Sequence, residues 1–214
     1  MNKTSPSIRQ WSISVSIALM AIIALVMAII LFIKPDQNQV SSTDQPYANN
    51  ILSPPRPALS FDLVNQHGNS VSLESFGDNP VLITFLYTQC TKACPLITGK
   101  LQQLNRILDN TGIHLEIVAI SVDPERDSIA EVYDYSQKWN MEDDWHYLVG
   151  TQEQLSPIWE YYWAQPTAGS SELQNYLSHS PPVFLVTNHE IIVAMSNANF
   201  EPNLLANYLA TLGQ

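Results

Sequence analysis

The chain has 214 residues, of which 9 are basic and 20 acidic, and its formal net charge is −11. This charge excludes nucleic acid as a partner, because phosphate backbones are bound by basic surfaces. A chain of this length can bury a core without disulfides, so its two cysteines need not be structural.

An apolar run near the N-terminus is the first clear signature. Residues 11–33 carry no charged side chain, and a 23-residue helix is long enough to cross the roughly 30 Å hydrocarbon core of a membrane. A cleaved signal peptide is the alternative, but its apolar region is normally about 7–15 residues. Lys3 and Arg9 precede the run and favour a cytoplasmic N-terminus. We therefore expect a cytoplasmic segment at residues 1–10, a single transmembrane anchor in the cytoplasmic (inner) membrane, and a C-terminal domain in the periplasm or on the exported side.

The composition changes after this anchor. Residues 34–60 are rich in Pro, Asn, Gln, Ser and Asp, which is typical of a flexible linker. All 20 acidic residues lie beyond Lys34, so the exported part is strongly acidic. Such a surface suits a basic or metal-carrying partner, and solubility is an equally good explanation. We expect the folded domain at residues 61–214.

The domain alternates strand-like and helix-like segments. Residues 61–64 and 71–73 flank a turn and predict a hairpin. The apolar run 81–87 is typical of a strand buried on both faces, and residues 95–108 carry leucines at helical spacing. The later elements are a strand at 115–122, helices at 127–139 and 152–163, a hairpin of 183–186 with 191–195, and a helix at 202–212. This order predicts an α/β, thioredoxin-like fold with an N-terminal β-hairpin, preceded by the transmembrane helix.

Cys90 and Cys94 lie where the buried strand meets the first long helix. Pro95 disfavours α geometry in the residue before it and suits the first helical position, which predicts Cys94 at the helix N-cap and Cys90 in the preceding loop. Unpaired N–H groups at the helix end, together with Lys92, should lower both thiol pKa values. A structural disulfide is the alternative, but so small a loop restricts the unfolded chain little. Thiolates ligate metals and attack disulfides, so both chemistries stay open.

Two thiolates do not complete a metal site. Soft thiolate ligands select Cu(I), Zn(II) or iron–sulfur chemistry, and a histidine is the expected third ligand. His179 stands out because it precedes the predicted strand 183–186, whose preceding loop faces the cysteine end of the helix in a thioredoxin-like fold. An ordinary loop histidine is the alternative. The other histidines occupy predicted turns or strand edges: His67, His114, His146 and His189.

Three motifs in order resemble the SCO/SenC family of copper chaperones. They are Phe-Leu-Tyr-Thr-Gln-Cys-x-x-x-Cys-Pro at residues 85–95, Ser-Val-Asp-Pro-Glu-Arg-Asp at 121–127, and His-Ser at 179–180 followed by Phe-Leu-Val at 184–186. The resemblance covers about residues 61–213. It implies that Cys90, Cys94 and His179 bind one copper ion, as Cu(I) and also as Cu(II). For Asp123 it implies a supporting or partner-recognition role, and an N-terminal helix signal is the alternative.

The resemblance also implies a function. The protein would be a membrane-anchored copper chaperone that delivers copper to the dinuclear copper centre of a respiratory cytochrome c oxidase. Its partners would be the copper-site subunit of that oxidase and other copper carriers or thiol reductases. The alternative is a thiol–disulfide oxidoreductase that reduces the oxidase cysteines before metallation, with Cys90 attacking and Cys94 resolving. Thr91 and Lys92 depart from the Pro and acidic residue usual in the family, which makes this cysteine loop more basic.

Overall fold

The computed structural model describes residues 20, 50–165, 181–196 and 199–212. The chain divides into two units, Met1–Asp44 and Gln45–Gln214, and Met20 is the one residue described in the first. Within the described ranges, no helix combines the length and the apolar character needed to cross a membrane. The predicted anchor, apart from Met20, and His179 lie outside the described residues.

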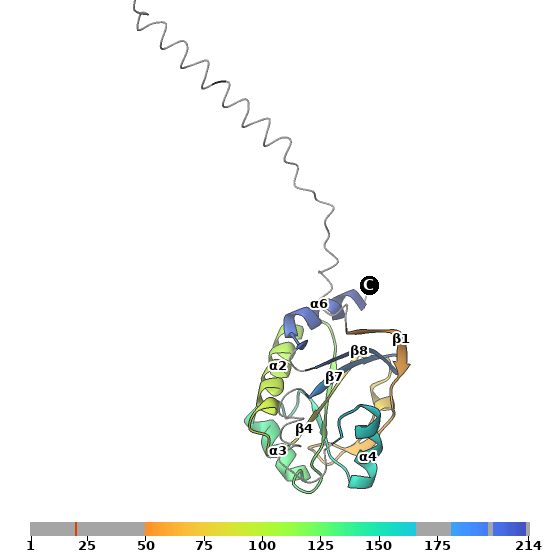
Figure 1. The fold of residues 1–214 in the computed structure, drawn as a ribbon. Coiled ribbons are helices and arrows are strands. Elements are labelled where there is room, and N and C mark those ends of the chain that lie inside the picture. The colour runs from red at the N-terminus through yellow and green to blue at the C-terminus, as the bar shows by residue number, and fades with distance from the viewer. Residues whose placement is uncertain (1–19, 21–49, 166–180, 197–198, 213–214) are drawn as a thin grey trace, which may run out of the picture. The chain divides into compact units, whose positions relative to one another are not determined.

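A six-stranded sheet forms the centre of the second unit (Figure 1). In spatial order its strands are β1 (Ile51–Pro57), β8 (Glu190–Ser196), β7 (Pro182–Thr187), β4 (Val81–Leu86), β5 (Glu116–Ser121) and β6 (His146–Leu148). β4, β5 and β6 are parallel, whereas β7 runs antiparallel to β4 and to β8, and β1 antiparallel to β8. β2 (Asp62–Val64) and β3 (Ser70–Ser72) form the predicted N-terminal hairpin, followed by the 3-10 turn η1 (Leu73–Phe76). The thioredoxin-like order of elements is therefore present.

Helices cover both faces of this sheet. They are α2 (Ala93–Leu108), α3 (Ile129–Lys138), α4 (Gln152–Tyr161) and α6 (Pro202–Leu212). α2, α3 and α6 lie on one face and α4 on the other (Figure 1). The helix starts have local causes: the Ser128 side chain accepts a hydrogen bond from the Glu131 N–H, and Thr151 forms a capping box with Gln154.

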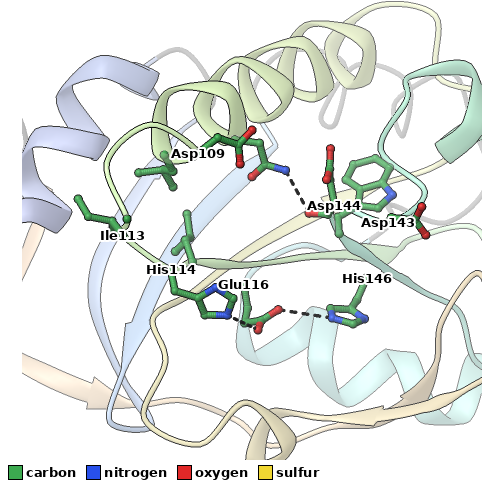
Figure 2. Close-up of a pocket in the computed structure, with 12 residues that line it drawn as sticks. Asp109, Ile113, His114, Glu116, Asp143, Asp144 and His146 are labelled. Atoms are coloured by element: carbon green, nitrogen blue, oxygen red, sulfur yellow. Dashed lines mark hydrogen bonds and ion pairs between the residues drawn. The ribbon is translucent and has the colours of Figure 1, made fainter.

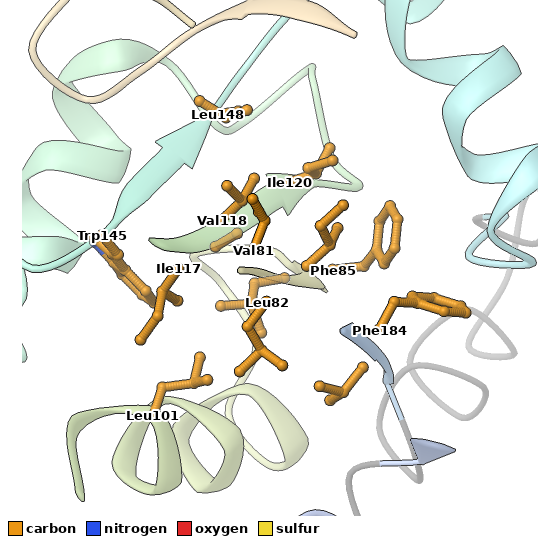
Figure 3. Close-up of a cluster of buried hydrophobic side chains, with 14 of the residues drawn as sticks. Val81, Leu82, Phe85, Leu101, Ile117, Val118, Ile120, Trp145, Leu148 and Phe184 are labelled. Atoms are coloured by element: carbon orange, nitrogen blue, oxygen red, sulfur yellow. The ribbon is translucent and has the colours of Figure 1, made fainter. Parts of the chain in front are cut away.

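The core fills both sides of β4. All six of its residues are buried, which confirms the prediction of a strand covered on both faces. Figure 3 shows Leu82 on the same side of the sheet as Leu101 of α2, while Phe85 and Phe184 point to the opposite side. There the Phe85 ring meets Tyr162, which follows α4, at 5.7 Å between ring centroids. Helices on both faces therefore hold β4, and with it the loop that follows, in place.

Leu101 tests the importance of this packing. Its side chain is fully buried, so Leu101→Ala should lower the free energy of unfolding by about 2–5 kcal/mol. Leu96, on the same helix but 67% exposed, is the matched control. Leu96→Ala should change the free energy of unfolding by less than about 0.5 kcal/mol. Urea denaturation followed by circular dichroism measures both. Equal effects of the two substitutions would contradict the placement of Leu101.

The prediction of a flexible linker up to residue 60 is wrong at its C-terminal end. Ile51–Pro57 forms β1, in which Arg56 and Pro57 pair with residues of β8. Proline cannot donate to a ladder, so a Pro-rich strand is tolerated at the edge of a sheet. The Arg56 guanidinium also stacks over the rings of Tyr161 and Trp163, with its Cζ 4.7 and 4.4 Å from the two ring centroids. These contacts attach the edge strand to the region of α4, and the folded unit begins before residue 61.

Candidate functional site

Three segments gather at one end of the sheet. The loop between β4 and α2 follows the carboxyl end of β4, and the carboxyl end of β5 lies beside it, because Leu86 pairs with Ser121 and accepts a hydrogen bond from the Val122 N–H at 3.0 Å. β7 begins at this same end, where the Thr84 hydroxyl donates to the Pro182 carbonyl at 3.0 Å. The loop that carries the cysteines, the segment after β5 and the first residue of β7 are therefore neighbours.

The two thiols are free, buried and in contact. Cys90 is 5% exposed and Cys94 is 1% exposed, and the Cys94 N–H donates to the Cys90 sulfur at 3.2 Å. The predicted N-cap position of Cys94 is wrong: α2 begins at Ala93, its N-cap is Lys92, and Cys94 and Pro95 are its second and third residues. Proline is accepted there because first-turn N–H groups have no acceptor within the helix. Lys92 makes no side-chain cap, and the Cys90 sulfur accepts one of these N–H groups instead.

The environments of the thiols separate their pKa values. The hydrogen bond between the two side chains is the largest cause that lowers the pKa of Cys90 to about 5, and the main-chain N–H groups of Cys94 and Lys92 add to it against the effect of burial. Burial and, next, the neighbouring Cys90 raise the pKa of the Cys94 thiol well above its usual range. The expected lowering is therefore confirmed for Cys90 and wrong for Cys94. The reduced pair is a thiolate beside a protonated thiol.

A buried carboxylate that the sequence analysis did not select lies behind the cysteine loop. Asp127 is 3% exposed, and its Oδ1 accepts hydrogen bonds from the N–H and the hydroxyl of Thr88 at 3.0 and 2.6 Å. Its Oδ2 accepts one from the Ser121 hydroxyl at 2.6 Å. The sequence motif at residues 121–127 ends on Asp127, but only the pairing of β4 with β5 brings this residue to Thr88.

Asp123 lies in the same segment and is nearly buried. Its Oδ2 accepts a hydrogen bond from Nε of Arg126 at 2.5 Å and is paired with Nη2 at the same distance. The alternative of a helix N-cap at Asp123 is wrong, because the side chain of Ser128 caps α3. The Arg126 side chain is about half exposed, so this ion pair borders the surface next to the cysteine loop.

The four histidines among the described residues lie away from this end. Figure 2 shows His114 and His146 on either side of Glu116, with Nε2–carboxylate distances of 2.8 and 3.5 Å, at the amino ends of β5 and β6. His67 bonds the Glu142 carbonyl in the approach to β6, and His189 is in the turn after β7. Within the part of the chain that the structure describes, no three His, Cys, Asp or Glu side chains are arranged to hold a metal.

The family assignment comes from comparison with known proteins. A model of the SCO1/SenC family matches residues 52–214, beginning inside β1. The chain belongs to the SCO1/SenC family. It is 33% identical over 91 residues to the SCO1 protein homolog of Bacillus subtilis, a match that covers 42% of this chain and 47% of that protein. The chain spans about half the length of the curated relatives it matches.

Solved Sco structures share the fold of this SCO1/SenC protein. BsSco, a member of the Sco family of cytochrome c oxidase assembly proteins in which a disulfide switch was identified, superposes with a TM-score of 0.63 at 22% identity, over 73% of this chain and 93% of that one. Copper-bound yeast Sco1 superposes with a TM-score of 0.57 at 21% identity, over 74% and 92%. The thioredoxin-like prediction is thus confirmed as a Sco fold.

The pKa of Cys90 predicts how this SCO1/SenC protein reacts with iodoacetamide. Because the thiolate is the nucleophile, alkylation of Cys90 should stay near its plateau from neutral pH down to about pH 5 and fall below it. An unfolded thiol titrates near 8.5, so this group's contribution to stability is present above about pH 8.5 and is lost as the pH falls through about 5. Mass spectrometry of the alkylated peptide measures the rate, and the urea-unfolded chain is the control. A midpoint near 8.5 in the folded protein would contradict the lowered pKa.

Proposed function

We propose that this protein is a membrane-anchored copper chaperone that delivers copper to the dinuclear copper centre of a respiratory cytochrome c oxidase. One ion is bound by Cys90, Cys94 and His179. The observation that carries the proposal is the pair of free thiols, packed against each other at the start of α2, in a chain of the SCO1/SenC family. The copper held by yeast Sco1 supports the choice of metal.

The donor set fits copper. Two sulfur ligands suit Cu(I), and an added imidazole suits both Cu(I) and Cu(II). Metal binding displaces the Cys94 proton, so uptake releases protons, since Cys94 holds its proton in the metal-free pair. Position 179 precedes Pro182 by three residues in the sequence, and Pro182 lies at the cysteine end of the sheet, while the described histidines do not. This arrangement supports His179 as the third ligand.

Delivery on the exported side follows from the sequence of the N-terminal region. Residues 11–33 serve as the anchor in the cytoplasmic membrane, residues 1–10 stay in the cytoplasm, and the folded unit works in the periplasm or its equivalent. Lys92 is exposed in the cysteine loop, and the ion pair of Asp123 with Arg126 borders the loop. The copper-site subunit of the oxidase approaches this end of the sheet, with Asp123 and Arg126 at its edge.

Copper stoichiometry tests the proposal. Full-length protein, reduced and kept in detergent, is titrated with Cu(I) against a competing chelator. One tightly bound copper per chain is expected. The control is the same protein after oxidation of its two thiols, which should bind none. Equal binding by the reduced and oxidised forms, or none by either, would overturn the copper-chaperone function.

A second function, thiol–disulfide exchange with the oxidase cysteines, is favoured by the unequal thiols. The Cys90 thiolate would attack a disulfide sulfur and release the other sulfur as a thiolate. Cys94 would then give up its proton and displace the partner, so that two electrons pass to the partner and Cys90 and Cys94 become a disulfide. Cys94→Ser should trap the mixed disulfide with a peptide disulfide. If no adduct forms at Cys90, this second function fails.

A further inference from the structure

Asp127 connects the cysteine loop to the strand beside it. It receives two hydrogen bonds from Thr88, which lies two residues before Cys90, and one from Ser121, the last residue of β5. Two other hydrogen bonds of the loop, from the Cys90 N–H to the Tyr87 carbonyl at 3.2 Å and from the Cys94 N–H to the Cys90 sulfur, remain within the loop and the first turn of α2. The carboxylate therefore ties the loop to the sheet, which the local bonds do not do.

Burial raises the pKa of Asp127, and the hydrogen bonds from Ser121 and Thr88 act in the opposite direction, because they stabilise its ionised carboxylate. Three donors converge on its two oxygens: the N–H and O–H of Thr88 on Oδ1 and the O–H of Ser121 on Oδ2. A charged acceptor makes such bonds shorter and about twice as strong as neutral ones. Asp127 is itself fixed, because its N–H donates to the Asp123 carbonyl at 2.9 Å. The Ser121 hydroxyl also accepts a bond from the Asp123 N–H at 3.0 Å, so this partner has a set orientation.

We propose that Asp127 is a positioning residue of the copper site: its carboxylate clamps the loop carrying Cys90 to the end of β5 and so sets the Cys90 sulfur over the first turn of α2. This inference rests on the proposed function. Thr88 and Cys90 are joined by a single intervening residue, so movement of the clamped N–H displaces the sulfur directly. The Cys90 sulfur is then held in its binding position before the ion arrives. Such preorganisation raises affinity because less conformational freedom of the loop is lost on binding.

Substitution of the clamp should weaken copper binding without removing a ligand. Partners that orient metal ligands typically contribute about 10–100-fold in affinity, and Asp127→Ala should lower Cu(I) affinity by about that factor. The Cu(II)–thiolate absorption band and the Cu(II) paramagnetic resonance spectrum should shift, because the Cys90 sulfur moves. Thr88→Val removes one of the three donors, whereas Thr88→Ser keeps all three, so Thr88→Ser should bind copper more tightly than Thr88→Val.

Asp62 provides a matched control. It also accepts a hydrogen bond from a serine hydroxyl, that of Ser70 at 2.5 Å, but at an exposed position of the β2–β3 hairpin. Asp62→Asn should leave the affinity and both spectra unchanged. Thermal unfolding of each variant shows whether it is folded, and Asp127→Asn serves if Asp127→Ala is not. In Asn the carbonyl end can still accept from Thr88, but a neutral acceptor forms weaker bonds than a carboxylate, so the clamp is loosened.

Hydrogen exchange of the full-length, metal-free protein makes the test independent of copper. The amides of residues 88–90 should exchange faster in Asp127→Asn than in the wild type, relative to the amides of β7. If the exchange, the Cu(I) affinity and the spectra of a folded Asp127 variant all match the wild type, the clamp is overturned. If the wild-type protein itself binds no copper, the proposed function fails, and unchanged exchange in the variant would still refute the clamp.

Discussion

Replacing Cys90 by serine should abolish tight Cu(I) binding by the full-length protein. Serine keeps the size of the side chain but removes the soft sulfur ligand, and one thiol cannot hold Cu(I) against a competing chelator. Loss of a ligand should exceed the cost of losing a partner that orients one, so we expect a fall in affinity of more than about 100-fold. Cys94→Ser should have an effect of the same order, and chelator competition at equal protein concentration measures both.

The two serine variants differ in their effect on the fold. Cys90 contacts the N–H of Cys94 through its sulfur, and a serine oxygen can accept the same bond. Cys94 is 1% exposed, so its replacement buries a new hydroxyl, which costs about 1–3 kcal/mol where no partner is found. Cys94→Ala avoids that cost, and its Cu(I) affinity should fall as far as that of Cys94→Ser. Tight binding by a folded Cys90→Ser or Cys94→Ala protein would contradict the two-thiolate site.

The central strands and helices were predictable because their side-chain patterns are local. The run Val81–Leu86 is apolar except for Thr84 and is buried throughout, and α6 lies over the residues predicted for it. β1 was missed for a physical reason. Its segment Ile51–Pro57 is rich in proline and has no apolar alternation, and it becomes a strand only by pairing with β8 at the edge of the sheet.

The cysteines of the candidate site could be selected from the sequence, but the residues that support them could not. Cys90 and Cys94 can be identified as candidates from their residue type and their spacing. The role of Asp127 depends on the register of β4 with β5, which sets Ser121 beside Leu86 and brings Thr88 within reach. The opposite pKa shifts of the two thiols depend on burial and on the bond from the Cys94 N–H to the Cys90 sulfur. The helix-end effect expected from sequence acts on both thiols alike and cannot separate them.

His179→Ala should separate copper delivery from thiol exchange. Two thiolates remain in this variant, so Cu(I) should still bind and should lose less affinity than in Cys90→Ser, whereas Cu(II), which prefers imidazole over a second thiolate, should be lost to a larger extent. In disulfide exchange, the two electrons that this protein supplies come only from Cys90 and Cys94. The trapping reaction of a peptide disulfide at Cys90 should therefore proceed in the variant as in the wild type.

His189 supplies the control for this experiment, because it lies in the turn after β7, at the end of the sheet opposite the cysteines. His189→Ala should bind Cu(I) and Cu(II) as the wild type does. In cells that depend on the protein for oxidase assembly, loss of the copper centre in His179→Ala, with thiol exchange intact, is expected if copper is the cargo. Normal assembly in His179→Ala together with failure in both cysteine variants would refute the chaperone function. The reason is that both chemistries need the cysteines, whereas only copper binding needs the histidine.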